Sequence, residues 1–217
     1  MRVLSFILLI YWAIALANAI LNLLLLRRAR VTALAREPFV SIIIPARNEQ
    51  RAIEPTVRAL LAQHYSAFEL IVVDDRSTDL TGTILDSIAA EDPRLVVIHG
   101  EEPPAGWLGK PWALHQGSGR ARGELLLLVD ADIHYAPDGL RAAVGHLEST
   151  GASMTALLPR FEMRGFWEHA AMPNVPMAAL LLPLWLGELL SLWPLALGGG
   201  TGNLVRREIY DAVGGHE

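Results

Sequence analysis

The 217-residue chain contains no cysteine, and only 19% of its residues are charged. The missing thiols exclude disulfide bonds and thiolate metal sites, and they fit a reducing compartment. A net charge of −5 and a pI of about 5.8 give no electrostatic basis for nucleic-acid binding. Basic residues number 18, yet Lys110 is the only lysine among them, which draws attention to its position.

Two nucleotide-binding signatures are also missing. No Gly-x-Gly-x-x-Gly turn follows the first predicted strand, and no Walker A sequence occurs anywhere in the chain. Both motifs wrap backbone N–H groups around phosphates at the start of a helix, so their absence argues against a dinucleotide Rossmann site and a P-loop.

Apolar residues are abundant, at 52% of the chain, and they concentrate in two blocks. The first, Val3–Leu26, is long enough to span a bilayer as a helix. Arg27, Arg28 and Arg30 follow it at once, and this bias predicts an anchor in the inner (cell) membrane with the downstream chain on the cytoplasmic side. A cleaved signal peptide is the alternative, because Ala17–Ala19 resembles a cleavage site. The continued apolar run and the arginines form a stop-transfer pattern, which favours the anchor.

The second block, Met177–Leu197, is also long enough to span a membrane, but it contains Pro183, Pro194 and Glu188. A true span would separate the following segment from the acidic cluster at Asp130. We therefore expect interfacial or re-entrant helices over Phe166–Leu197, with a plain second span as the alternative. Three tryptophans would lie at headgroup level: Trp167, Trp185 and Trp193.

Between the blocks, strand and helix patterns alternate. Short β-branched or leucine-rich runs predict buried strands, and runs with helical spacing predict helices. The strands are expected at 39–44, 70–73, 95–98 and 124–129; the helices are expected at 51–63, about 80–90 with Ser77, Thr78 and Asp79 as caps, and from Pro111 onward. Strict alternation predicts an α/β fold with a mostly parallel sheet.

Polar or acidic residues follow three of these strands. They are Pro45 to Glu49, the pair Asp74-Asp75, and Asp130-Ala131-Asp132. Ligands of open parallel sheets bind beyond the carboxyl ends of the strands, so these three segments should line one crevice. Asp130 and Asp132 would repel each other unless a hard cation lay between them, and Mg²⁺ or Mn²⁺ bound by carboxylates and substrate phosphates matches this ligand set. The alternative is a turn that caps the helix after Pro137.

Four ordered segments carry a family resemblance: Ser41–Glu49, Val72–Asp79, Gly106–Ala113 and Val129–Asp132. Together they closely resemble the family-2 glycosyltransferases of GT-A fold. The Gly106–Pro111 stretch most resembles the membrane-anchored bacterial members associated with hopanoid and carotenoid glycosylation. The resemblance covers roughly residues 39–160 well and 200–217 more loosely.

The resemblance implies a nucleoside-diphosphate sugar as donor and an inverting transfer to an acceptor hydroxyl, with a lipid acceptor suited to an interfacial site. Asp75 would contact the nucleobase or ribose; Glu49 would do the same or be a solvated loop acid; Arg47 would contact a phosphate or the base, or be a surface arginine. The implied donor-binding set is Pro45, Arg47, Glu49, Asp75, Lys110, Asp130 and Asp132, of which Asp130 and Asp132 would hold the metal. His115 is expected to be structural.

The expected organisation is an anchor at 1–30, a GT-A core at 38–160, a hydrophobic interfacial segment at 161–198, and an incomplete acceptor-side subregion at 199–217. Gly202 and Asn203 are expected on the acceptor side. Glu217, Glu188 and Asp211 are base candidates only by default, because the family places its base beyond this point; the chain is therefore expected to be truncated. A nucleotidyltransferase and a non-catalytic nucleotide-sugar-binding membrane protein remain the alternatives.

Overall fold

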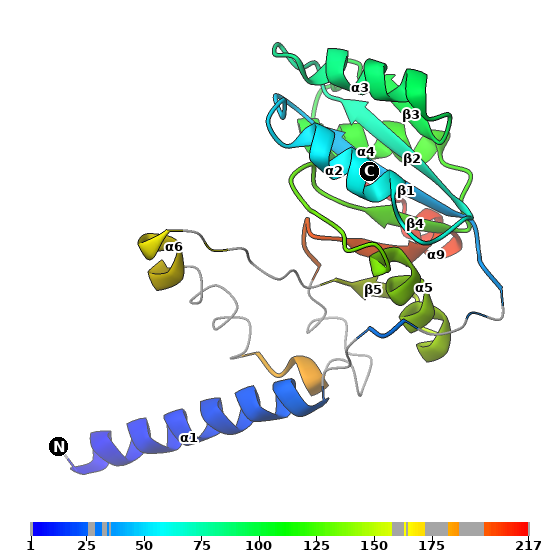
Figure 1. Ribbon diagram of the computed structural model, residues 1–217. Helices are drawn as coiled ribbons and strands as arrows, with labels where there is room; N and C mark the ends of the chain where they lie inside the picture. The colour runs from blue at the N-terminus through cyan, green and yellow to red at the C-terminus, as the bar shows by residue number, and fades with distance from the viewer. Residues whose placement is uncertain are drawn as a thin grey trace. The chain divides into compact units, whose positions relative to one another are not determined.

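The protein is described from a computed structural model (Figure 1). The described residues are 2–25, 29–31, 34, 36–157, 163, 165–171, 182–186 and 198–216. The chain divides into two units, and each is described by itself. One unit comprises Met1–Arg28 and Pro159–Leu197; the other comprises Ala29–Leu158 and Gly198–Glu217.

The first unit is built on the helix α1, Arg2–Leu25. Most of its large apolar side chains from Phe6 onward are exposed. The part from Ser5 to Leu25 has a mean hydropathy of 2.2, and it is the one helix among the described residues that is long and apolar enough to cross a membrane. This result agrees with the predicted anchor in length and composition.

Two asparagines of α1 interrupt its apolar surface for a structural reason. The Asn22 amide donates to the Leu182 carbonyl at 2.9 Å and accepts from the Trp185 backbone at 3.0 Å, while Asn18 accepts from the Trp185 indole at 3.0 Å. The same unit contains α6, Phe166–Ala171. The interfacial or re-entrant helices expected over Phe166–Leu197 fall within the described residues only at 166–171 and 182–186.

The second unit contains a six-stranded sheet in the order β3-β2-β1-β4-β6-β5 within its described residues. Four neighbouring strands are parallel: β1 (Val40–Ala46), β2 (Phe68–Asp74), β3 (Leu95–His99) and β4 (Leu125–Leu128). The last two, β6 (Asn203–Arg206) and β5 (Met154–Ala156), form antiparallel pairs, β6 with β4 and β5 with β6. The predicted mostly parallel α/β sheet is thereby confirmed.

Helices cover both faces of the sheet because successive strand residues point to opposite sides. Ile42 and Ile44 pack into a core with α2 (Ile53–Leu61), α3 (Thr81–Glu91) and α5 (Gly139–Thr150). On the other face, Ile43 packs with α4 (Gly109–Arg120) and α9 (Arg207–Ala212). The interiors of β1, β2 and β4 are nearly fully buried, which explains their unbroken apolar runs.

Two predicted boundaries were wrong. Strand β1 continues through Pro45 because β4 ends opposite Ile43, so the missing proline N–H lies where no strand needs it. Helix α4 begins at Gly109 rather than Pro111. The backbone N–H groups of the first helical turn have no intrahelical acceptor, so a proline, which lacks this N–H, is accommodated anywhere in that turn. Helix α3, Thr81–Glu91, ends close to the predicted Ala90. Of the three predicted caps, Asp79 accepts from the Thr81 N–H at 3.0 Å.

A buried acid ties the opposite edge of the sheet together. Glu69 on β2 accepts from the Ser41 hydroxyl at 2.6 Å and from the Arg122 guanidinium and backbone at 2.8 Å each. Burial alone would raise the pKa of Glu69, but the hydrogen bonds from Arg122 and Ser41 outweigh it, and the pKa of Glu69 is lowered. The contacts of Glu69 therefore stabilise the amino-terminal edge of the sheet, and the carboxyl edge is left for ligand binding.

Candidate donor-sugar site

The carboxyl ends of β1, β2 and β4 open into one cleft of about 360 Å³. Parallel strands place their carboxyl ends at the same sheet edge, and α4 closes the cleft from the side. The structure brings together in this cleft all seven residues of the predicted donor-binding set. The lining is Pro45, Ala46, Arg47, Glu49, Asp75, Gly109, Lys110, Asp130, Ala131 and Asp132.

Asp75 is the most deeply placed carboxylate of the cleft, with 4% of its surface exposed. Its backbone N–H donates to the Ala46 carbonyl at 2.8 Å, which joins the ends of β1 and β2. The carboxylate lies 3.1 Å from the Arg76 guanidinium and 3.5 Å from that of Arg47. A Cβ on Gly109 would lie 2.7 Å from the carboxylate, so this glycine permits α4 to approach it. The two guanidinium groups therefore hold the Asp75 carboxylate with its oxygen atoms at the cleft.

The loop that carries Glu49 is held by the loop after β2. The Asn48 N–H donates to the Ser77 hydroxyl at 2.9 Å, and the Glu49 N–H donates to the Thr81 hydroxyl at 2.8 Å. Asn48 has a φ of 57°, a left-handed conformation that asparagine tolerates better than most residues. These contacts hold the Glu49 backbone in place before any ligand arrives.

The Glu49 carboxyl has a perturbed pKa. Burial raises it above its usual range, and the negative charges of Asp132, Asp79 and Asp130 raise it further. Glu49 therefore lies in the negative electrostatic field of the Asp130–Asp132 turn. A cation bound there would relieve this repulsion.

Asp130 lies where three segments meet. Its backbone N–H donates to the Gly200 carbonyl at 2.7 Å, and its carboxylate forms an ion pair with the Lys110 ammonium. A Cβ on Gly200 would lie only 1.7 Å from the Asp130 carboxylate. Only glycine at position 200 lets the segment before β6 pass this closely, so Gly200 shapes the site although it carries no functional group.

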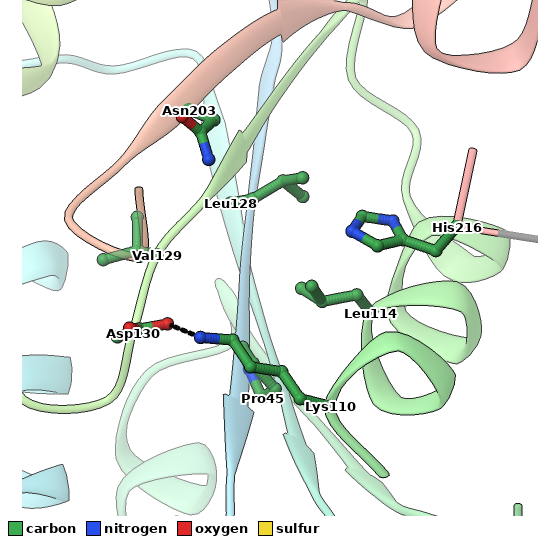
Figure 2. A pocket seen from close by; sticks show the side chains of 9 residues that line it. Pro45, Lys110, Leu114, Leu128, Val129, Asp130, Asn203 and His216 are labelled. Carbon is green, nitrogen blue, oxygen red and sulfur yellow. Dashed lines mark hydrogen bonds and ion pairs between the residues drawn. The ribbon is translucent and has the colours of Figure 1, made fainter. Parts of the chain in front are cut away.

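A second, inner pocket of about 170 Å³ shares Pro45, Lys110 and Asp130 with the donor cleft (Figure 2). Figure 2 shows the ring of His216 pointing into this pocket beside Leu114. The remaining lining residues come from the end of β4 and from the start of β6: Leu128, Val129, Gly200 and Asn203.

The two predicted acceptor-side residues have different positions. Asn203 lines the inner pocket, but its amide also exchanges hydrogen bonds with the Gly199 backbone, at 2.9 and 3.3 Å. Gly202 does not line either pocket. Its φ is 144°, and a Cβ there would lie 2.2 Å from the Tyr135 hydroxyl, so its glycine is required by local packing.

Sequence reasoning missed Gly200 and His216. The run of three glycines at 198–200 was a signal for close backbone approach, and His216 stands directly after the Gly214-Gly215 pair. That pair follows α9, with positive φ at both glycines and the Gly215 N–H donating to the Tyr210 carbonyl at 2.9 Å.

The aromatic cluster beside Lys110 fits the expected structural role of His115. Its ring stacks on Trp112 with centroids 5.3 Å apart and an angle of 15°, and it lies 5.0 Å from the ring of Trp107. The Trp112 indole donates to the Glu101 carbonyl at 3.1 Å. The cluster supports the N-terminal part of α4, from which Lys110 extends.

The residues present fit a divalent cation that is shared with a substrate. The described residues contain no group of three or more His, Asp and Glu side chains able to hold a metal by themselves. Asp130 and Asp132 both line the donor cleft, and Mg²⁺ or Mn²⁺ typically binds one or two carboxylates together with substrate phosphates. The raised pKa of Glu49 reflects the same concentration of negative charge.

This geometry can be compared with known proteins. The sequence model of glycosyl transferase family 2 matches residues 41–214, which include both pockets except His216. The chain belongs to glycosyl transferase family 2. The matched range contains all four ordered segments on which the resemblance rested.

Several curated relatives are also glycosyltransferases. A beta-monoglucosyldiacylglycerol synthase of Nostoc sp. is 32% identical over 187 residues, which cover 82% of this chain and 38% of that protein. A probable glycosyltransferase of Bacillus subtilis is 33% identical and covers 57% of this chain and 33% of its own length. The chain therefore spans well under half the length of these relatives.

Among solved structures, a mannosyltransferase from Pyrobaculum calidifontis in complex with GDP-Man and Mn²⁺ superposes with a TM-score of 0.69. It is 23% identical and covers 94% of this chain and 55% of its own. At that identity the likeness shows the fold, and it confirms the predicted GT-A architecture.

Proposed function

We propose that the protein transfers a sugar from a nucleoside-diphosphate sugar to a hydroxyl of a lipid acceptor, with inversion and with a divalent cation. The observation that carries this proposal is the convergence of the three strand ends and of Lys110 on one cleft. Family membership favours a transferase and gives no support to the nucleotidyltransferase alternative.

Five side chains of the cleft have roles in donor binding. Asp75 accepts hydrogen bonds from the ribose or nucleobase, for which its buried carboxylate, held by Arg76, suits it. Arg47 contributes positive charge at the same end. Lys110 balances charge on the diphosphate as a compact cation. Asp130 and Asp132 hold the cation, which when bound supplies positive charge to the leaving diphosphate.

The transfer itself is one displacement. The acceptor oxygen bonds to the anomeric carbon on the face opposite the diphosphate, the bond from that carbon to the diphosphate oxygen breaks, and a base takes the hydroxyl proton. Asp211 is a poor candidate for this base, because it is exposed, lies 3.6 Å from Arg207 and lines neither pocket. Glu188 and Glu217 lie outside the described residues.

A lipid acceptor is supported by two independent features. The helix α1 carries a stretch of 21 residues that is apolar enough to anchor the chain in a membrane, with arginines directly after it. One group of relatives is named for synthesis of a glucosyl diacylglycerol. We place the anchor in the inner membrane with the family-2 domain on the cytoplasmic side, by the same charge bias.

Calorimetric titration of detergent-solubilised protein with UDP-glucose, GDP-mannose and UDP-GlcNAc, with and without Mn²⁺, tests the donor site. Wild type should bind at least one of them in a Mn²⁺-dependent manner. Asp132→Ala should lose most of that affinity, whereas Asp138→Ala, an exposed acid outside both pockets, should not. Equal donor affinity in Asp132→Ala and wild type would overturn the assignment.

A further inference from the structure

The strongest unassigned feature is a hydrogen-bond chain that ends in the inner pocket. Four groups follow one another: the His115 carbonyl, the Ser118 hydroxyl, the Tyr210 hydroxyl and the His216 imidazole. The Ser118 and His115 oxygens are 2.9 Å apart, the Tyr210 and Ser118 oxygens are 3.3 Å apart, and Nδ1 of His216 lies 2.7 Å from the Tyr210 oxygen. Ser118 and Tyr210 are buried, with 8% of each exposed.

The direction of this chain follows from its first member. A carbonyl only accepts, so the Ser118 hydroxyl must donate to His115, and the Ser118 oxygen is left to accept from Tyr210. The Tyr210 hydroxyl then has no hydrogen left for His216, so its oxygen accepts from Nδ1–H of the imidazole. In the opposite arrangement Tyr210 would donate to Nδ1. A hydrogen would then remain between the Tyr210 and Ser118 oxygens only if the Ser118 hydroxyl turned away from the His115 carbonyl, which would break the 2.9 Å hydrogen bond.

A neutral histidine carries one ring proton, and here it lies on Nδ1. Burial lowers the pKa of His216, and the nearby His115 lowers it further, so the ring is neutral at pH 7. Burial also raises the pKa of Tyr210, which keeps its hydroxyl protonated. Nε2 of His216 is therefore a hydrogen-bond acceptor.

The local backbone places this acceptor in the pocket. Gly214 and Gly215 reverse the chain after α9, and a Cβ on Gly215 would lie 3.0 Å from the Tyr210 ring. The rings of Tyr210 and His216 have centroids 5.6 Å apart. His216 lines the inner pocket with Lys110 and Asp130, at the end that the donor cleft does not reach. Figure 2 shows the ring extending into this space.

We propose that His216 is a substrate-binding residue whose Nε2 accepts a hydrogen bond from a substrate hydroxyl in the inner pocket, with Tyr210 and Ser118 setting its tautomer. The hydroxyl belongs to the donor sugar or to the acceptor, since both meet beyond the diphosphate. The identity of this hydroxyl rests on the proposed function; the tautomer is a property of the protein alone.

Nitrogen NMR of protein labelled with ¹⁵N-histidine tests the tautomer without any ligand. The chain has 7 histidines, and the His216→Asn variant assigns the resonances of His216 by their loss. We expect His216 to carry its proton on Nδ1, and the Tyr210→Phe variant to shift it toward Nε2. A wild-type His216 protonated on Nε2 overturns the inference, whether or not nucleotide sugars bind.

Binding measurements test the hydroxyl contact. The asparagine of His216→Asn reaches only the position of Nδ1, whereas the glutamine of His216→Gln reaches that of Nε2 and keeps an acceptor there. We expect His216→Asn to weaken UDP-glucose or GDP-mannose binding about tenfold, to leave UDP or GDP binding unchanged, and His216→Gln to restore most of the loss. Matched thermal unfolding of the variants controls for folding.

The contact belongs to the acceptor hydroxyl instead if two results occur together. The nucleotide-sugar affinity of His216→Asn is unchanged, and its KM for diacylglycerol in vesicles is raised and is restored in His216→Gln. If neither quantity changes, the proposal is wrong. Failure of the wild type to bind any nucleotide sugar with Mn²⁺ would overturn the proposed function, and the tautomer measurement would still decide the hydrogen-bond chain.

Discussion

The Lys110 ammonium contacts the Asp130 carboxylate at the boundary between the donor cleft and the inner pocket. Both side chains are partly exposed, at 53% and 34%. In the absence of a ligand, this lysine occupies one of the two carboxylates that we assign to the divalent cation. Without a bound donor, Lys110 and the cation therefore compete for the Asp130 carboxylate. With the donor bound, both attract its diphosphate.

Lys110→Met should consequently have opposite effects on two affinities. Mn²⁺ alone should bind about twofold to fivefold more tightly, because a partly exposed ion pair no longer competes. UDP-glucose or GDP-mannose should bind about tenfold more weakly, because a charged contact to the diphosphate is lost. Titration of each ligand separately measures both effects. Lys110→Arg, which keeps the charge, should lie close to wild type, and a weaker Mn²⁺ affinity in Lys110→Met would contradict the competition.

Asp75→Asn should weaken binding of the nucleoside part of the donor. Its buried carboxylate accepts more strongly than an amide, so we expect UDP and UMP, or GDP and GMP, to lose about tenfold in affinity together. Asp132→Ala should instead weaken the diphosphate and spare the monophosphate, because its effect acts through the shared cation. Equal effects of the two variants on both nucleotides would show that the cleft is not divided in this way.

Gly200→Ala should displace Asp130. A Cβ at position 200 would overlap the Asp130 carboxylate, which would have to turn away from its place in the cleft. We expect the Mn²⁺-dependent donor affinity to fall about tenfold or more through loss of a charged ligand. Gly199→Ala is the matched control, since a Cβ there would meet only the Thr201 hydroxyl at 3.8 Å. If the two alanine variants bind the donor equally well, the close approach of Gly200 to Asp130 is not needed for donor binding.

Glu49→Gln should stabilise the protein at neutral pH. Burial and the nearby Asp132 raise the pKa of Glu49 above its ordinary value of 4.5, so the folded state binds this proton more tightly than the unfolded chain. Stability is therefore lost as the pH rises from 4.5 through the raised pKa. Urea unfolding at pH 7 should show Glu49→Gln to be more stable than wild type, with the difference vanishing below about pH 4.

Glu69→Gln should show the opposite sign. Its pKa is lowered on folding, because the hydrogen bonds from Arg122 and Ser41 outweigh burial, so the ionised form stabilises the fold above 4.5 and this contribution is lost as the pH falls. At pH 7 the variant should lose about 2 kcal/mol in the free energy of unfolding, and the loss should shrink toward pH 3. Parallel pH profiles for the two glutamine variants would refute one of the two assignments, and the sign of the shared slope would show which.

The sequence determined much of the donor site. Buried strands leave unbroken apolar runs, and polar residues directly after them mark the carboxyl edge of a parallel sheet. For this reason the sequence predicts that Glu49, Asp75, Asp130 and Asp132 line one cleft, and the structure brings them together there. Local periodicity and chain order suffice here, because βαβ connections leave little choice of topology.

The inner pocket was decided only by tertiary structure. Strand β6 pairs with β4 although Asn203 and Leu128 are far apart in the sequence, and no periodic pattern specifies that neighbour. This pairing brings Gly200 against Asp130 and lets His216 fold back onto Tyr210. Such relationships depend on packing distances and hydrogen-bond directions between distant segments. The single lysine and the Asp130 turn could be read from the residues, but their ion pair could not.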